Sequence, residues 1–229
     1  MEIIIRCLQR EGPKYGYHIN PSKGKYLIGR CASLEDAELI RAKLVNDLGL
    51  ADNIIIKHPE NDSSDLSLDE KMKNYGVKVV GSYIGSSEFI KHQLDVYFQE
   101  LEDSASKLMN HKDLQERMIL FRDSFLKKPL HIFRTVNPKF TQEFARKFEV
   151  LKIKVLCSIL GFDSSEHLSD LHCKIAQLSI KEGGLGLQDH CLVGKAAFVA
   201  SVIGFHQKFK KVLTADVDLS HQNPEIYLF

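Results

Sequence analysis

The chain has 229 residues, of which 44% are hydrophobic and 27% are charged, and its net charge is +1. This length and composition are typical of one or two folded domains and exclude a largely disordered chain. The near-zero net charge excludes a chain that is basic or acidic throughout.

The cysteine pattern and the lack of long apolar runs predict the cellular compartment. The five cysteines are an odd number and form no Cys-x-x-Cys pair, so we expect a reducing, intracellular location in cytoplasm or nucleus. No stretch approaches the roughly 20 apolar residues that span a bilayer, so no membrane partner is expected. The cysteines are Cys7, Cys31, Cys157, Cys173 and Cys191.

The first part of the chain alternates short strands with a helix. Ser33 precedes Asp36 by three residues, which resembles a capping box and predicts a helix that Gly49 ends. The other elements expected here are a helix or strand over 1–11, a turn over 12–16, strands over 25–29, 53–57 and 76–84, and an acidic loop over 59–70.

From Ser86 onwards the apolar pattern is helical. Apolar residues from Phe89 to Leu108 recur at spacings of three and four, which places them on one helix face. The later helices are expected over 112–127 with a break at Pro129, over 141–160 after a break at Pro138, from a cap at Ser164 or Ser165 to 176, and over 189–209.

These patterns predict an α+β fold that is mostly α, with a small antiparallel sheet followed by a helical bundle. The expected regions are 1–85 (mixed α/β), 86–213 (helical) and 214–229 (a C-terminal tail).

Charge is distributed unevenly between the two parts. Residues 32–70 carry ten acidic against three basic side chains, whereas residues 105–156 carry twelve basic against five acidic side chains. A basic helical surface can bind a phosphate backbone. The same lysines could equally be the solvated faces of amphipathic helices, and the sequence leaves both readings open.

No complete catalytic or metal site is found by residue spacing. Gly24 and Gly29 have Walker A spacing, but Arg30 and Cys31 follow where Lys and Ser or Thr are required. The pairs His172–Cys173 and His190–Cys191 could enclose zinc only if the backbone were irregular, since adjacent helical ligands diverge by about 100°. We therefore predict no metal site within this chain.

Three segments in order resemble the C-terminal part of a reverse transcriptase of the non-LTR-retrotransposon or group-II-like kind. The first is 16–23, which is similar to the palm segment beside the incoming nucleotide. The second is the Val-Gly-Ser hairpin at 77–85, which resembles the primer grip. The third is 176–187, with Gly-Gly-Leu-Gly-Leu, followed by an Ala-rich helix. With the helices between them, the segments span nearly the whole chain.

The resemblance implies roles for particular residues. Gly16, Asn20 and Lys23 would lie near the nucleotide, and Gly81 and Ser82 would approach the primer strand. The first region would be a palm remnant, and the helical region would be a thumb and connection that bind RNA or DNA. The expected nucleic-acid contacts are Lys107, Lys112, Arg117, Arg122, Lys127, Lys128 and Arg134.

The chain departs from this family at the catalytic centre. No Tyr/Phe-x-Asp-Asp motif occurs, and two-metal phosphoryl transfer needs such carboxylates to hold its Mg²⁺ ions. In the family those carboxylates would precede residue 1, so we expect no cofactor in this chain and no polymerase activity from it alone. A palm cut there would leave an open strand edge, which predicts self-association or association with an N-terminal half.

Two functions therefore follow from the sequence. The first is a reverse-transcriptase-like fragment that binds RNA or DNA backbone without catalysis. The alternative is a helical protein–protein interaction or scaffold protein with no nucleic-acid role.

Overall fold

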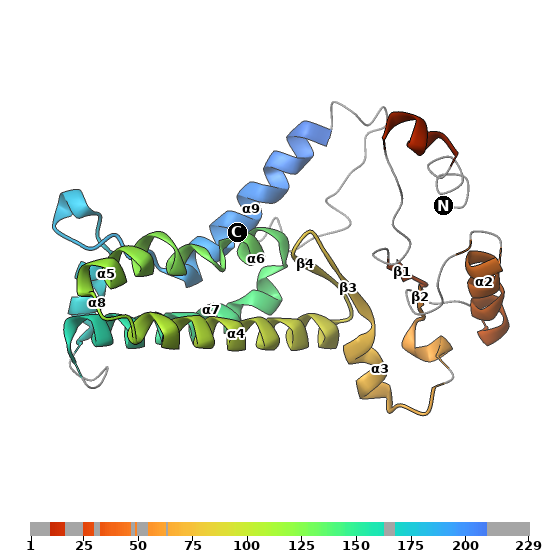
Figure 1. The fold of residues 1–229 in the computed structure, drawn as a ribbon, viewed down its shortest axis with the longest axis horizontal. Helices are drawn as coiled ribbons and strands as arrows, with labels where there is room; N and C mark the ends of the chain where they lie inside the picture. The colour runs from red at the N-terminus through yellow and green to blue at the C-terminus, as the bar shows by residue number, and fades with distance from the viewer. Residues whose placement is uncertain are drawn as a thin grey trace. The chain divides into compact units, whose positions relative to one another are not determined.

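The computed structural model describes residues 10–16, 25–29, 33–46, 49, 55–62, 64–162 and 168–209. The chain forms two compact units, shown in Figure 1. Unit 1 comprises Met1–Val79 and Tyr83–His92, and unit 2 comprises Val80–Ser82 and Gln93–Phe229. The chain therefore passes from unit 1 to unit 2 inside a helix, after His92, whereas the sequence placed the boundary after residue 85.

Unit 1 contains a short βαβ arrangement. Strand β1 (Tyr26–Leu27) and strand β2 (Ile55–Ile56) are parallel, with Tyr26 opposite Ile55 and Leu27 opposite Ile56. Helix α2 (Leu34–Asn46) connects them, and Ser33 Oγ accepts the Asp36 N–H at 3.1 Å, as the capping pattern predicted. The expectation of a purely antiparallel sheet is wrong for this pair, because a helical crossover returns the second strand in the same direction.

A second difference concerns the segment expected to be an acidic loop. It contains the 3₁₀ turn η3 (Pro59–Asn61) and leads into helix α3 (Leu68–Asn74). Ser67 and Glu70 form a full capping box at the start of α3. The acidic residues in the first turn suit the positive end of the helix dipole, so they belong to a helix start rather than to a loop.

The predicted strand at 76–84 is a hairpin. Strand β3 (Gly76–Val79) pairs with strand β4 (Ser82–Gly85) in the small antiparallel sheet that the sequence led us to expect. Val80 and Gly81 form the two-residue turn, with φ angles of 50° and 81°. Two positive φ angles in a row are the signature of a type I′ hairpin turn.

The rest of the described chain is mostly helical, as expected. Pro138 lies in the first turn of helix α7 (Pro138–Leu160), where its missing N–H costs nothing, so it begins a helix rather than breaking one. Ser169 caps α8 in place of Ser164 or Ser165, which lie outside the described residues. The remaining elements are η1 (Gly12–Tyr15), α4 (Ser87–Met109), α5 (Leu114–Asp123), η4 (Phe125–Lys127), α6 (Leu130–Thr135), α7 (Pro138–Leu160), α8 (Asp170–Gln177), η6 (Ile180–Glu182) and α9 (His190–Phe209).

The core of unit 2 is aromatic and lies where α6, α7 and α9 pack together (Figure 1). Phe148 on α7 is fully buried, and its ring stacks on Phe125 at 5.4 Å between centroids. Phe144, one turn earlier, packs against Phe133 of α6 at 5.9 Å and against Tyr97 of α4 at 5.9 Å. Burying such rings supplies much of the stabilisation of the bundle.

Among the described helices, none combines the length and the apolar character needed to cross a membrane.

Candidate nucleic-acid interface

A cleft with a volume of about 440 Å³ lies on unit 2 and is lined by three cationic side chains. Arg122 comes from the end of α5, Lys127 from η4, and Lys181 from η6, more than fifty residues further along the chain. The fold therefore brings together basic groups from two distant segments. The other lining residues are Asp123, Leu126, Leu130, Ser179, Ile180, Gly186, Gln188 and His190.

The first wall of the cleft is formed where α5 ends. Phe125 and Leu126 are buried and belong to the short 3₁₀ turn η4. Lys127 follows them and stays 61% exposed, so its ammonium group is available at the cleft. Pro129 then starts α6, since it lacks the N–H that a continuing helix would need.

The second wall is the turn around the Gly-Gly-Leu-Gly-Leu motif. Ser179 and Glu182 form a capping box around η6, which presents Lys181 to solvent. Gly184 is required there by close packing, because a Cβ on it would lie 2.2 Å from the Leu178 carbonyl oxygen. The segment forms a tight loop, in which Gly183 and Gly186 adopt positive φ angles of 85° and 70°.

One carboxylate moderates the positive charge of the cleft. Asp123 lies 3.0 Å from the Arg122 guanidinium and 3.7 Å from the Lys127 ammonium. The hydrogen bond from Arg122, with a smaller contribution from Lys127, lowers the pKa of Asp123 below its ordinary value. Within the described residues, Lys181 has no acidic partner. The lining therefore keeps an excess of positive charge that suits a phosphate group.

A buried network of charged groups reaches the cleft through His190, which is part of its lining. Lys152 is 1% exposed and donates to Glu149 Oε2 at 2.5 Å and to the Gln188 carbonyl oxygen at 2.9 Å. His190, also 1% exposed, has Nδ1 2.8 Å from Glu149 Oε1 and Nε2 2.9 Å from the Leu126 carbonyl oxygen. A carbonyl oxygen can only accept, so Nε2 donates to Leu126 in this arrangement.

Glu149 remains ionised within this network. Burial raises the pKa of its carboxyl, but the hydrogen bonds from His190 and Lys152 outweigh burial, and the pKa lies below the ordinary value. The backbone N–H of His190 also donates to Glu149, at 2.9 Å. A carboxylate with three donors is well stabilised even when most of its surface is removed from water.

The other predicted nucleic-acid contacts lie outside the cleft. Lys107, Lys112 and Arg134 are exposed on α4, on the α4–α5 connection and on α6. Lys128 donates to Ser104 Oγ at 2.8 Å. Arg117 is used internally, because its guanidinium donates to the carbonyl oxygens of His111 and Ser158. Of the seven predicted contacts, only Arg122 and Lys127 meet in the cleft.

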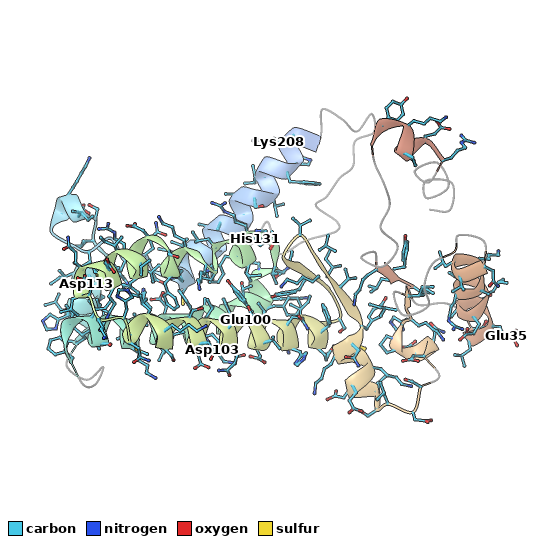
Figure 2. All side chains as sticks on the ribbon, in the orientation of Figure 1. Glu35, Glu100, Asp103, Asp113, His131 and Lys208 are labelled. Atoms are coloured by element: carbon cyan, nitrogen blue, oxygen red, sulfur yellow. The ribbon has the colours of Figure 1, made fainter. Side chains whose placement is uncertain are left out.

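The tip of the β3–β4 hairpin contacts α6. His131, labelled in Figure 2, places Nε2 2.9 Å from the Val80 carbonyl oxygen, and a Cβ on Gly81 would lie 3.1 Å from that nitrogen. Ser82 Oγ lies 3.5 Å from the Thr135 carbonyl oxygen, which it faces as a donor. Gly81 and Ser82, predicted to approach a primer strand, are therefore close to α6.

The residues predicted to lie near a nucleotide are only partly described. Gly16 follows η1 as an exposed left-handed cap with φ 79°. Asn20 and Lys23 lie outside the described residues. Their predicted roles therefore stay predictions.

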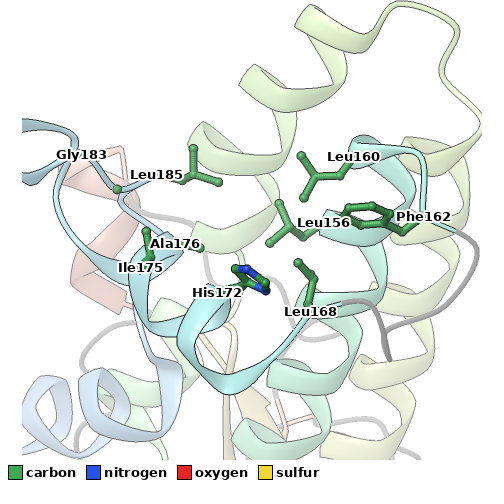
Figure 3. A pocket seen from close by; sticks show the side chains of 10 residues that line it. Leu156, Leu160, Phe162, Leu168, His172, Ile175, Ala176, Gly183 and Leu185 are labelled. Carbon is green, nitrogen blue, oxygen red and sulfur yellow. The ribbon is translucent and has the colours of Figure 1, made fainter.

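A second, apolar cavity of about 350 Å³ lies between the end of α7, helix α8 and the glycine-rich turn (Figure 3). Leu156 and Ala176 are buried in its wall, whereas Leu160, Phe162 and Ile175 are 41–48% exposed. Exposed apolar side chains grouped around a hollow are a feature of interaction surfaces.

The described residues contain no group of three or more His, Cys, Asp or Glu side chains that could hold a metal ion. His172 Nδ1 instead accepts the backbone N–H of Ser169 as part of the α8 cap, at 3.3 Å. Cys157, Cys173 and Cys191 are free thiols, and burial raises the pKa values of Cys157 and Cys191.

Four residues of this site were not predicted from the sequence. Lys181 stands next to the motif that carried the family resemblance, so its position in a tight turn was the available signal. Glu149 and Lys152 carried no comparable signal, because helical spacing does not distinguish a buried ion pair from a solvated one. His190 was considered only as a zinc ligand beside Cys191.

Comparison with known proteins gave no relative. No family model, curated protein or solved structure matches the chain.

Proposed function

We propose that this chain is a reverse-transcriptase-like fragment without the catalytic carboxylates, and that unit 2 binds the phosphate backbone of RNA or DNA. The observation that carries the proposal is the convergence of Arg122, Lys127 and Lys181 on one cleft. The ordered resemblance of three sequence segments to the palm, primer grip and thumb region supports the same class of ligand.

The lining chemistry favours a phosphate ligand over base recognition. Guanidinium and ammonium groups bind phosphate oxygens, and binding releases the counterions condensed on the nucleic acid. Gln188 and Ser179 are the uncharged polar side chains of the lining, and Ser179 already donates to Glu182 at 2.9 Å. A cleft with so few base-reading groups positions a strand without specifying its sequence.

The test is the salt dependence of binding. The full chain is titrated into a fluorescein-labelled 20-nucleotide single strand at several salt concentrations, and the anisotropy gives log Kd against log salt. A slope of about 0.7 per neutralised phosphate is expected for a single strand. The variants R122Q, K127Q and K181Q should each weaken binding and lower the slope by about one contact.

A matched control is available on the same unit. Lys154 is exposed on α7 and does not line the cleft, so K154Q removes the same charge elsewhere. This variant should leave the slope unchanged. Affinity that does not change with salt would contradict nucleic-acid binding, and an equal effect of K154Q and the cleft variants would contradict the assignment of the cleft.

The alternative function, a helical protein–protein interaction protein, is supported by the apolar cavity beside α8. Charge reversal at Lys127, Lys128 and Arg134 distinguishes the two. Loss of nucleic-acid binding favours the first function. Loss of a protein complex, with no change in nucleic-acid binding, favours the alternative.

A further inference from the structure

We infer that Glu149, Lys152 and His190 are positioning residues that hold the two walls of the basic cleft at a fixed separation. This inference rests on the proposed function, because the cleft matters only if a ligand occupies it. None of the three side chains needs to touch the ligand. They act through the backbone segments that carry the cationic groups.

The contacts of the network end on both walls. His190 donates through Nε2 to the carbonyl oxygen of Leu126, the residue directly before Lys127. Lys152 donates to the carbonyl oxygen of Gln188, which lines the opposite wall. Glu149 accepts from both donors and so connects the two walls through α7.

The chemical character of the network favours positioning over simple stabilisation. A buried ion pair gains little over well-packed apolar side chains, because desolvation of the charges offsets their attraction. A hydrogen bond to a particular carbonyl oxygen depends on distance and angle, so it holds that backbone segment in one position. Apolar contacts, in contrast, tolerate small displacements. The turns of both walls have hydrogen bonds of their own, such as Gly186 N–H to the Leu178 carbonyl oxygen at 2.8 Å, so the network links the walls to α7 and does not form them.

The test uses two variants for which charge alone and positioning predict different outcomes. E149Q and E143Q each remove one carboxylate from α7, and Glu143 is 78% exposed and pairs, among the residues that the structure describes, only with Lys147. Electrostatics alone predicts that both variants bind an anionic strand more tightly. Positioning predicts that E143Q binds as tightly as the wild type or up to about twofold more tightly, whereas E149Q binds at least about fivefold more weakly and with a smaller salt slope.

The result that overturns the inference is E149Q binding as tightly as E143Q with an unchanged salt slope. A loss of global folding is separated from a local effect by amide hydrogen exchange of the full chain. The reporters are the amides of Leu187 and Lys128, which donate to Ala176 and Phe125 at 3.1 and 3.2 Å. In E149Q both should exchange at least about tenfold faster, while the Val155 amide within α7 keeps its protection.

A second variant tests one wall at a time and does not depend on E149Q folding. K152M keeps a long apolar stem and removes the donor to the Gln188 carbonyl oxygen and to Glu149, whereas the contacts of His190 with Glu149 and with Leu126 are retained. It should speed exchange at Leu187 and leave Lys128 unchanged. Equal protection of Leu187 in K152M and in the wild type would contradict the inference.

The exchange experiment does not require any ligand. If the wild-type chain fails to bind the labelled strand, the proposed function fails, and the exchange rates still decide whether the network positions the walls.

Discussion

At the residue scale, a carboxylate inside a packed helical unit makes the stability of that unit depend on pH. Glu149 is 20% exposed and accepts hydrogen bonds from Lys152 and His190. These bonds hold its pKa below the ordinary value despite burial. A carboxyl whose pKa is lower in the folded chain stabilises the fold at pH values above its unfolded pKa, and that contribution is lost as the pH falls through the folded pKa.

The resulting prediction concerns unfolding by urea at different pH values. The difference in unfolding free energy between the wild type and E149Q should be about 3 kcal/mol at pH 7, the cost of breaking a buried pair. It should shrink as the pH falls below about 4.5, where the ordinary glutamate carboxyl protonates. Circular dichroism at each pH measures both curves.

Groups that do not contact Glu149 cancel in the difference because both proteins contain them, whereas Lys152 and His190 lose their carboxylate partner in E149Q and contribute to it. The charge of Glu149 also acts on the Cys191 thiol at the start of α9. The exposed carboxylates with lowered pKa values, such as Glu38 and Asp123, cancel in the same way. A difference that stays constant between pH 7 and pH 3 would show that Glu149 contributes through packing alone.

At the element scale, local signals in the sequence predicted helices better than strand directions. The capping residue Ser33 and the helix end at Gly161 lie where the sequence placed them, because caps depend on neighbouring residues only. The parallel pairing of β1 with β2 depends on a crossover helix between them, and no local pattern reports the direction of a two-residue strand. Ser67 and Glu70 have the spacing of a capping box in the sequence. The helix that they begin has only seven residues, so its apolar pattern is too short to support the prediction.

The hairpin turn gives a prediction at this scale. Val80 has φ 50°, a conformation that is unfavourable for a β-branched side chain, and it is 89% exposed, so its side chain contributes little packing. Asn tolerates this conformation, so V80N should raise the unfolding free energy by about 1 kcal/mol. The backbone carbonyl that faces His131 is retained. The midpoint of urea unfolding measures the gain.

The control for this variant is V79N, because Val79 lies in the strand next to the turn and is 43% exposed. Asn is depleted in strands, so V79N should give no gain or a loss. A gain of equal size in both variants would mean that the effect comes from replacing an exposed apolar side chain by a polar one, and not from the turn conformation.

At the scale of the whole molecule, the uneven charge of the sequence predicted a basic helical region. It did not indicate which basic residues line the cleft. Twelve basic side chains lie between residues 105 and 156, yet the fold buries Lys152, directs Arg117 to backbone carbonyls and pairs Lys147 with Asp95. Lys181 joins Arg122 only through tertiary packing. Charge counts therefore indicate a class of ligand, whereas the site itself depends on contacts between distant segments.

The final prediction concerns how the whole chain discriminates among nucleic acids. The cationic groups of the cleft suit phosphate, and phosphate spacing does not depend on base sequence, so affinity should depend on length and salt and not on sequence. Two 20-nucleotide strands of equal length and scrambled composition should bind within about twofold of each other at each salt concentration, since a recognised base would contribute at least about 1 kcal/mol.

The measurement is a competition titration, in which each unlabelled strand displaces the same labelled one. A preference of more than about tenfold for one sequence corresponds to about 1.4 kcal/mol and would require groups that read bases. Those groups would have to lie outside the cleft or include Gln188, and Q188A would separate the two cases. If the preference survives Q188A, the contact that selects the base lies elsewhere on the chain, and the cleft would then only anchor the strand.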